Sequence, residues 1–118
     1  MRILDNLFGP QADYLKKSMD RATLRHSLLS ENLANLNTPG YKRKDVDFGI
    51  TLEQTMAEAG GEAAPIRVEQ GNRRADENSV DLEQEITGLG ETELRYQTLA
   101  DMTARYFSGL KNVIREGK

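Results

Sequence analysis

The stretch that decides the fold reads FGPQADYLKKSMDRATLRHSLLSENLANLNTPGY and occupies residues 8–41. One line of positions in it recurs at alternating steps of four and three residues. This period of 3.5 residues is typical of a helix that packs along a second helix, although an ordinary amphipathic core helix shows a similar pattern. Pro10 suits the first turn of a helix, so we predict a helix over residues 11–36. The positions in this line are Phe8, Ala12, Leu15, Met19, Ala22, His26, Leu29, Leu33 and Leu36.

A second line with the same period lies near the other end of the chain and predicts a helix over residues 81–115. Asp81, followed three residues later by Gln84, resembles a capping box at its start. Gly88 and Gly90 predict a weak point in this helix or a place where another backbone comes close. The positions in this line are Leu82, Ile86, Leu89, Glu93, Tyr96, Ala100, Thr103, Phe107, Leu110 and Ile114. A neighbouring stripe widens the apolar face enough for two partners: Leu99, Met102, Tyr106 and Val113.

Residues 37–80 between the two helices are irregular. Thr38-Pro39-Gly40-Tyr41 has the residues of a type II turn, with Pro fixing φ at the second position and Gly accepting a positive φ at the third. Asp47 can cap a short helix to about residue 58, and residues 57–64 look flexible. The alternation around Ile66 and Val68 is a weak strand signal.

The fold class that follows is mainly α. Two long terminal helices pair in a coiled-coil-like bundle, and the irregular middle contributes a short helix and a weak strand or hairpin. With 118 residues and 37% hydrophobic residues, the chain is long enough for a single domain, residues 1–118. Its modest apolar content makes stability that depends on partners plausible.

Enzyme chemistry has little support in the sequence. His26 is the only histidine and lies in the first apolar line, where a polar residue that sets helix register is the simpler interpretation. The carboxylate pairs Asp45 with Asp47 and Glu83 with Glu85 lack histidine or cysteine neighbours and are interpreted as solvated charge. We therefore predict no catalytic residues, no metal site and no cofactor.

Net charge and hydropathy limit the classes of partner that the chain could bind. The net charge is -3, which argues against nucleic-acid binding. Residues 1–44 carry 8 basic and 4 acidic side chains, whereas residues 45–118 carry 8 basic and 15 acidic ones, so the halves could attract within or between chains. The basic clusters at residues 42–44 and 73–74 are interpreted as solvated loops or as ion-pairing sites for neighbouring subunits. No stretch is apolar enough for direct membrane insertion, and no cleaved signal peptide is recognised at the N-terminus.

The sequence also resembles a known family. The run Leu29-Ser30-Glu31-Asn32-Leu33-Ala34-Asn35-Leu36-Asn37-Thr38-Pro39-Gly40-Tyr41-Lys42 resembles the signature of flagellar rod, hook and hook-associated proteins, in which an N-terminal helix ends in Asn-x-x-Asn-x-Asn-Thr-Pro-Gly-Tyr. Further stretches look like the short proximal-rod members of that group. The chain is thus identified as a member of the flagella basal-body rod protein family. The further stretches are residues 44–48, 71–72, 78–82 and 94–97.

The resemblance implies a structural subunit that polymerises by helix packing into the axial tube of the bacterial flagellum basal body. Its implied partners are copies of itself, other rod and basal-body proteins and the flagellar type III export apparatus. Its implied location is the periplasm-spanning rod, reached without a cleaved signal peptide. Two alternatives stay open: a sibling proximal-rod protein within the family, and a helical dimerising adaptor or regulator from another class.

Two sets of residues carry this hypothesis. In the first, the amides of Asn32, Asn35 and Asn37 could satisfy the last carbonyl groups of the helix, and the following turn forces an abrupt exit. This assembly motif and helix-exit turn comprises Asn32, Asn35, Asn37, Thr38, Pro39, Gly40 and Tyr41. The second set is the predicted helix seam and subunit interface: Leu15, Met19, Leu29, Leu33, Leu36, Tyr96, Leu99, Phe107, Leu110 and Ile114.

Overall fold

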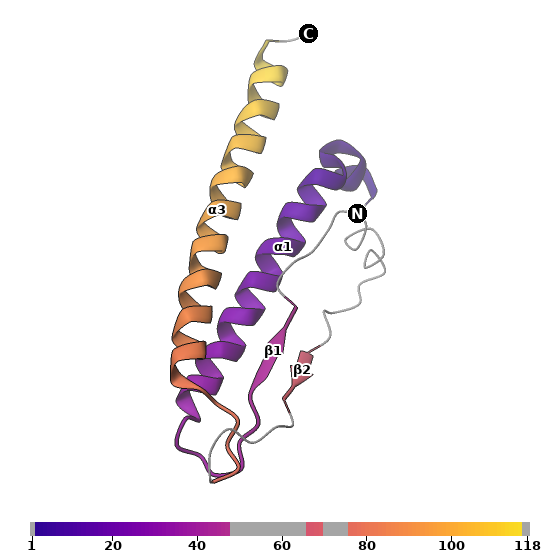
Figure 1. Cartoon of the computed structure of the whole chain (residues 1–118). Coiled ribbons are helices and arrows are strands. Elements are labelled where there is room, and N and C mark those ends of the chain that lie inside the picture. The colour runs from indigo at the N-terminus through magenta and orange to yellow at the C-terminus, as the bar shows by residue number, and fades with distance from the viewer. Residues whose placement is uncertain (1, 48–65, 70–75, 117–118) are drawn as a thin grey trace.

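Two long helices lie side by side in the computed structural model, with a two-stranded hairpin next to one end of the pair (Figure 1). The structure describes residues 2–47, 66–69 and 76–116. Its elements are α1 (Arg2–Ala34), β1 (Lys44–Val46), β2 (Ile66–Val68) and α3 (Leu82–Arg115). The prediction of a mainly α fold with two long packed helices is confirmed. The predicted short helix from Asp47 and the flexible run at 57–64 lie almost wholly outside the described residues.

The first helix differs from its predicted bounds at both ends. It begins at Arg2 but is interrupted at Gly9, where φ is 73° and the backbone leaves the helical region. Its last helical residue is Ala34, two residues before the predicted end. The reason is a tightened final turn: the Asn35 amide donates to the carbonyls of both Glu31 and Asn32, and the Leu36 amide donates to the carbonyl of Leu33.

The second helix begins and ends close to its predicted bounds. Asp81 is the N-cap residue, and its side chain accepts hydrogen bonds from the amides of Glu83 and Gln84. The cap therefore satisfies two of the four amide groups that a helix start leaves without partners. A local sequence signal was sufficient here because the donors and the acceptor lie within three residues of one another.

The two helices are in close contact at Gly88. A Cβ atom placed there would lie 2.8 Å from Cδ1 of Leu29, so only glycine fits without a shift. Leu29 is fully buried, as are Leu15 and Ala22 on the same face of α1. The close neighbour of Gly88 is the Leu29 side chain and not another backbone, and a Cβ atom at Gly90 would meet nothing within 4 Å.

Near its N-terminal end, the face of α3 that packs against α1 is not the predicted apolar line. The buried residues of α3 are Glu85, Gly88 and Thr92, which carry small or polar side chains. Periodicity missed this register because an ion pair and a close glycine contact, rather than an apolar stripe, fix the rotation of α3. Several residues of the predicted line stay exposed instead: Leu82 at 44%, Ile86 at 55%, Tyr96 at 40%, Phe107 at 44% and Ile114 at 77%.

The other predicted seam residues divide between the core and its edge. Leu15 and Leu29 are buried, and Met19 is half-buried with its sulfur 3.5 Å from the Thr103 hydroxyl of α3. The remaining predicted positions are half-buried: Leu33, Leu36, Leu99 and Leu110. His26, predicted as a polar residue inside the seam, is exposed.

The hairpin places residues of the middle segment against α1. Strands β1 and β2 are antiparallel, with Asp45 opposite Arg67 and Val46 opposite Ile66. The predicted strand around Ile66 is confirmed, but its partner β1 follows directly after the predicted turn and was not recognised. β1 carries charged residues at two of its three positions, which hides it from a search for alternating apolar side chains.

Candidate functional site

The helix-exit turn has the geometry that its residues predict. The Tyr41 amide donates to the Thr38 carbonyl at 3.2 Å, and Gly40 has a φ of 75°. Both features are those of a type II turn with glycine at its third position. The Gly40 amide donates to the carbonyl of Asp76 at 2.9 Å, so the turn is also tied to the segment that leads into α3.

The three asparagines of the motif lie in three different environments. Asn35 caps the helix as predicted, since its Nδ2 donates to the carbonyl of Glu31 at 2.9 Å. Asn37 is exposed. Asn32 does not cap the helix end, because its fully buried amide points toward β1 instead. The prediction of a shared capping role therefore holds for Asn35 and is wrong for Asn32.

Asn32 connects α1 to the chain that follows the turn. Its Nδ2 donates to the Lys44 carbonyl at 2.7 Å, and its Oδ1 accepts from the Lys44 amide at 2.9 Å. The side chain thus pairs with Lys44 as a neighbouring strand would. Oδ1 also accepts from the Tyr41 hydroxyl at 3.2 Å, and Nδ2 donates to Glu85 Oε2 at 3.2 Å. One buried amide therefore joins α1, the turn, β1 and α3.

The carbonyls just after the end of α1 are satisfied by Asn78, for which the sequence predicted no such role. Its Nδ2 lies 3.0 Å from the Asn35 carbonyl, 3.3 Å from that of Leu36 and 2.6 Å from that of Thr38. Asn78 is fully buried, and its Oδ1 accepts from the Val80 amide at 2.7 Å. A residue about forty positions away thus holds the segment that follows α1.

A buried ion-pair network lies beside these asparagines. Arg43, only 2% exposed, donates from Nε to Glu85 Oε1 at 2.5 Å and from Nη1 to Glu69 at 2.8 Å. Arg25 donates to Asp45 Oδ1 at 3.0 Å, and Arg43 lies 3.4 Å from the other oxygen of that carboxylate. We refer to Arg25, Asn32, Arg43, Asp45, Asn78 and Glu85 together as the polar junction.

Two members of the polar junction, Arg43 and Asp45, have pKa values shifted toward their charged forms. Burial disfavours the charge on Arg43, but the hydrogen bond and the charge of Glu85 outweigh it, so the pKa of Arg43 is raised. Burial likewise acts to raise the pKa of Asp45. The hydrogen bonds from Arg25 and from the Val46 amide outweigh that effect and lower this pKa below its ordinary value of 3.8. Arg43 and Asp45 are therefore held in their charged forms.

Several charged residues interpreted as solvated are thus buried. Asp45 is 5% exposed and Glu85 is fully buried, whereas their companions Asp47 and Glu83 are exposed as predicted. The basic cluster at residues 42–44 is not a solvated loop either. Lys42 donates from Nζ to the Glu77 carbonyl, and Lys44 pairs with Glu31 at 3.3 Å. Both contacts lie within one chain, and the Lys44 contact is with an acidic side chain.

The lowered pKa of Asp45 predicts acid sensitivity. A depressed folded-state pKa contributes stability that is present above the unfolded-state value and is lost as the pH falls through the folded-state value. We therefore expect the free energy of unfolding to decrease below about pH 4, and Asp45→Asn to remove part of that dependence. Asp47→Asn, at an exposed neighbour, is the matched control. Urea unfolding at a series of pH values measures the effect. If the free energy of unfolding depends on pH equally for Asp45→Asn and for the unsubstituted chain, the prediction is contradicted.

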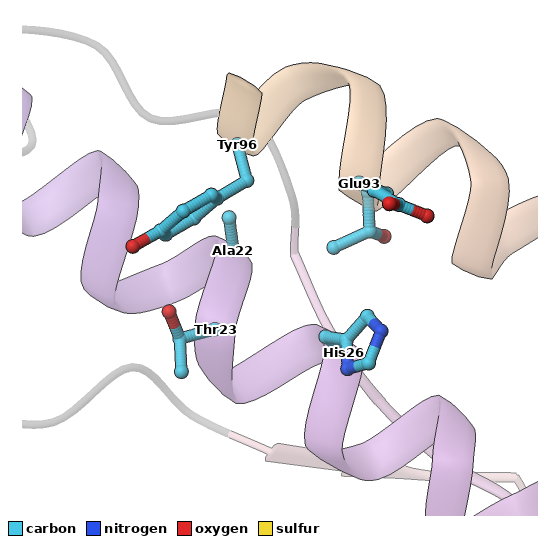
Figure 2. Close-up of a pocket in the computed structure, with 6 residues that line it drawn as sticks. Ala22, Thr23, His26, Glu93 and Tyr96 are labelled. Carbon is cyan, nitrogen blue, oxygen red and sulfur yellow. The ribbon is translucent and has the colours of Figure 1, made fainter. Parts of the chain in front are cut away.

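A hollow lies between the helices on the side where the apolar line of α3 is exposed (Figure 2). It has a volume of about 300 Å³. Ala22 and Thr92 are buried, whereas His26, Glu93 and Tyr96 are exposed. Figure 2 shows Tyr96 reaching from α3 over α1 near Ala22, with His26 below Glu93. The complete lining is Ala22, Thr23, His26, Thr92, Glu93 and Tyr96.

The described residues contain neither a metal site nor a membrane span. Within residues 2–47, 66–69 and 76–116, no group of three or more His, Asp or Glu side chains could hold a metal ion. Neither described long helix has an apolar stretch long enough to cross a membrane. The site thus consists of a polar junction, which connects the ends of the two helices, and of exposed apolar side chains, which form a surface suited to binding another protein.

Comparisons with known proteins agree with this picture. The chain is 36% identical over 106 residues to the flagellar basal body rod protein FlgB of Cereibacter sphaeroides, covering 77% of this chain and 83% of that protein. It is 27% identical to FlgB of Bacillus subtilis over 96% of this chain and 99% of that protein. It is 23% identical to FlgB of Yersinia enterocolitica over 98% of this chain and all of that protein. No protein-family model matches the chain. With the motif at the end of α1 and the paired long helices, these relatives show that the chain belongs to the FlgB family of flagellar basal body rod proteins.

Proposed function

We propose that this chain is a structural subunit of the proximal rod that polymerises by helix packing into the axial drive-shaft tube and catalyses no reaction. Its relatives are rod proteins by name, which supports a place in the basal body. The proposed partners are other copies of the chain, other rod and basal-body proteins and the flagellar export apparatus. The sibling considered within the family, a FlgC-type rod protein, is less favoured because these three relatives are FlgB proteins.

The observation that carries the proposal is the exposed apolar side of α3. Ile86, Tyr96 and Phe107 are 40% to 55% exposed although another face of α3 already packs on α1. Exposed apolar side chains in a row along one helix are typical of a surface that another protein covers. Helix packing between subunits would bury them.

The polar junction supports the same proposal in a different way. It fixes the direction in which the chain leaves α1 and the point at which α3 begins, through side chains that are mostly buried. A repeating assembly requires each subunit to present its surfaces at the same angle, because contacts between unlike surfaces propagate any error along the polymer. A rigid junction at one end of the helix pair meets that requirement.

The test is complementation of a strain that lacks the chromosomal copy. We expect Phe107→Asp to abolish swimming and incorporation into isolated basal bodies, because a charge buried in a packed interface is strongly unfavourable. Ser108→Asp, at the neighbouring exposed position on another side of α3, should swim normally. Immunoblots of basal bodies and of whole cells separate loss of assembly from loss of protein.

Two results would count against this function. Normal swimming with Phe107→Asp would show that assembly does not require the exposed apolar side of α3. A purified chain that forms a stable, closed dimer by sedimentation would favour the helical adaptor, because a closed dimer leaves no surface for continued growth.

A further inference from the structure

In Figure 1, the C-terminal turns of α3 extend beyond the N-terminal end of α1. We call residues 107–116 the α3 tip. Val113 and Ile114 in the tip are 67% and 77% exposed, and Phe107 is 44% exposed. Phe107, Lys111 and Ile114 are spaced by four and three residues, so they lie on one side of the helix. The tip therefore presents two apolar side chains with a lysine between them.

The interhelical hollow lined by Ala22, Thr92 and Tyr96 has features that complement this surface. Its volume of about 300 Å³ is well above the roughly 150 Å³ of an apolar cavity that accommodates benzene, so a large apolar side chain fits. Ala22 and Thr92 in its lining are small, which allows another helix to come close. Tyr96 adds an aromatic wall. A hole between two helices that receives a side chain from a third is the geometry of knobs-into-holes packing.

Charge makes the two surfaces complementary. Glu93 lines the hollow and is exposed, and Lys111 and Arg115 are exposed on the α3 tip. Within the part of the chain that the structure describes, none of these three residues forms an ion pair. The first turns of α3 are rich in acidic residues and the last turns in basic ones, so two copies attract when the tip of one approaches the hollow of the other.

We propose that the α3 tip of one subunit docks in the interhelical hollow of a second copy of this chain, with Ile114 as the inserted side chain and Lys111 next to Glu93. The inference rests on the proposed function and names the contact by which one copy meets the next. The tip and the hollow are different surfaces, and the same contact can repeat along a row of subunits. Within one chain the two surfaces cannot meet, because about thirty ångströms of continuous helix separate residue 93 from residue 114.

Disulfide crosslinking tests this contact directly, because the chain contains no cysteine. We would mix a His26→Cys protein with an Ile114→Cys protein of different tag size and oxidise the mixture. The yield of heterodimer should be at least about tenfold higher than in a mixture of His26→Cys with Ser108→Cys, because a disulfide requires the two Cα atoms to lie within about 7 Å of each other. Ser108 is the matched control because it is exposed on another side of the same helix tip.

A chain that carries both His26→Cys and Ile114→Cys tests the directionality. Oxidation should give a ladder of dimers, trimers and longer species. Dimers that grow no further would indicate a reciprocal pair and would overturn the repeating contact, and so would homodimers of Ile114→Cys alone.

Charge reversal provides an independent readout. Glu93→Lys should lower the heterodimer yield by about tenfold, and Lys111→Glu on the other partner should restore it, because unlike charges again face each other. Failure of the second change to restore the yield would overturn the proposed pairing.

The same variants, expressed as the only copy in cells, separate this inference from the proposed function. Crosslinks in isolated basal bodies support both the docking contact and the rod function. Cells that swim and build rods but give no crosslink overturn the docking and leave the rod function standing. Crosslinks in solution from a chain that never enters basal bodies support the docking and overturn the rod function.

Discussion

Arg43→Met is expected to destabilise the chain by about 3–5 kcal/mol, because removing one member of a buried ion pair leaves the other without compensation. Glu85 is fully buried and, among the described residues, would keep only the Asn32 amide as a hydrogen-bond donor. A domain of this size is stable by only about 5–15 kcal/mol in total, so the loss is a large fraction. Urea unfolding followed by circular dichroism measures it.

The two members of the Arg43–Glu85 pair should differ in how much stability is lost when each one is replaced. Glu85→Gln should cost less than Arg43→Met, because Arg43 would still pair with Glu69 and Asp45. The double variant Arg43→Met/Glu85→Gln should regain at least about half of the loss, since neither buried charge remains unpaired. Arg67→Met, at a 60% exposed side chain that pairs with Asp47, is the matched control and should change stability by less than about 1 kcal/mol. A similarly small effect of Arg43→Met would contradict the buried network.

Gly40→Val is expected to leave cells non-motile. The φ of 75° at Gly40 lies in the left-handed region, where a β-branched residue is strained by about 1–3 kcal/mol. A Cβ atom at this position would meet no atom within 4 Å, so the strain comes from the backbone and not from crowding. Relief of that strain redirects the chain between α1 and β1, and in a polymer the same error recurs in every subunit.

The comparison with Gly40→Asn isolates the backbone effect. Asparagine tolerates the left-handed region, so this variant should be milder in both stability and swimming. Denaturant unfolding of the purified chains and swimming assays in soft agar give the two readouts. Equal behaviour of Val and Asn at this position would show that the turn does not require a positive φ for assembly.

Local features of the fold were predictable from the sequence because their causes lie within a few residues. The two helices follow from a period of 3.5 residues, and the start of α3 follows from the Asp81 side chain next to the amides it caps. The turn follows from the φ preferences of Pro39 and Gly40. The capping by Asn35 reaches only four residues back, to Glu31.

The polar junction could not be predicted in the same way. Asn78 reaches the segment that follows α1 across about forty residues, and the Arg43 to Glu85 pair spans 42 residues. In the sequence, Glu85 looks like any charged residue in the first turn of a helix. Its burial becomes visible only when a cation from another element is placed beside it.

By itself, the sequence determined that the chain forms two long helices joined through a sharp turn, and its motif pointed to the family. Only the tertiary structure decided which side of α3 faces α1. Gly88 lets Leu29 approach, and Glu85 meets Arg43, so α3 turns small and polar side chains inward and leaves Ile86 and Phe107 exposed. This is because a buried ion pair and the contact of the Leu29 side chain with Gly88 depend on partners far away in the chain, whereas hydrophobic periodicity records only that a helix has an apolar side.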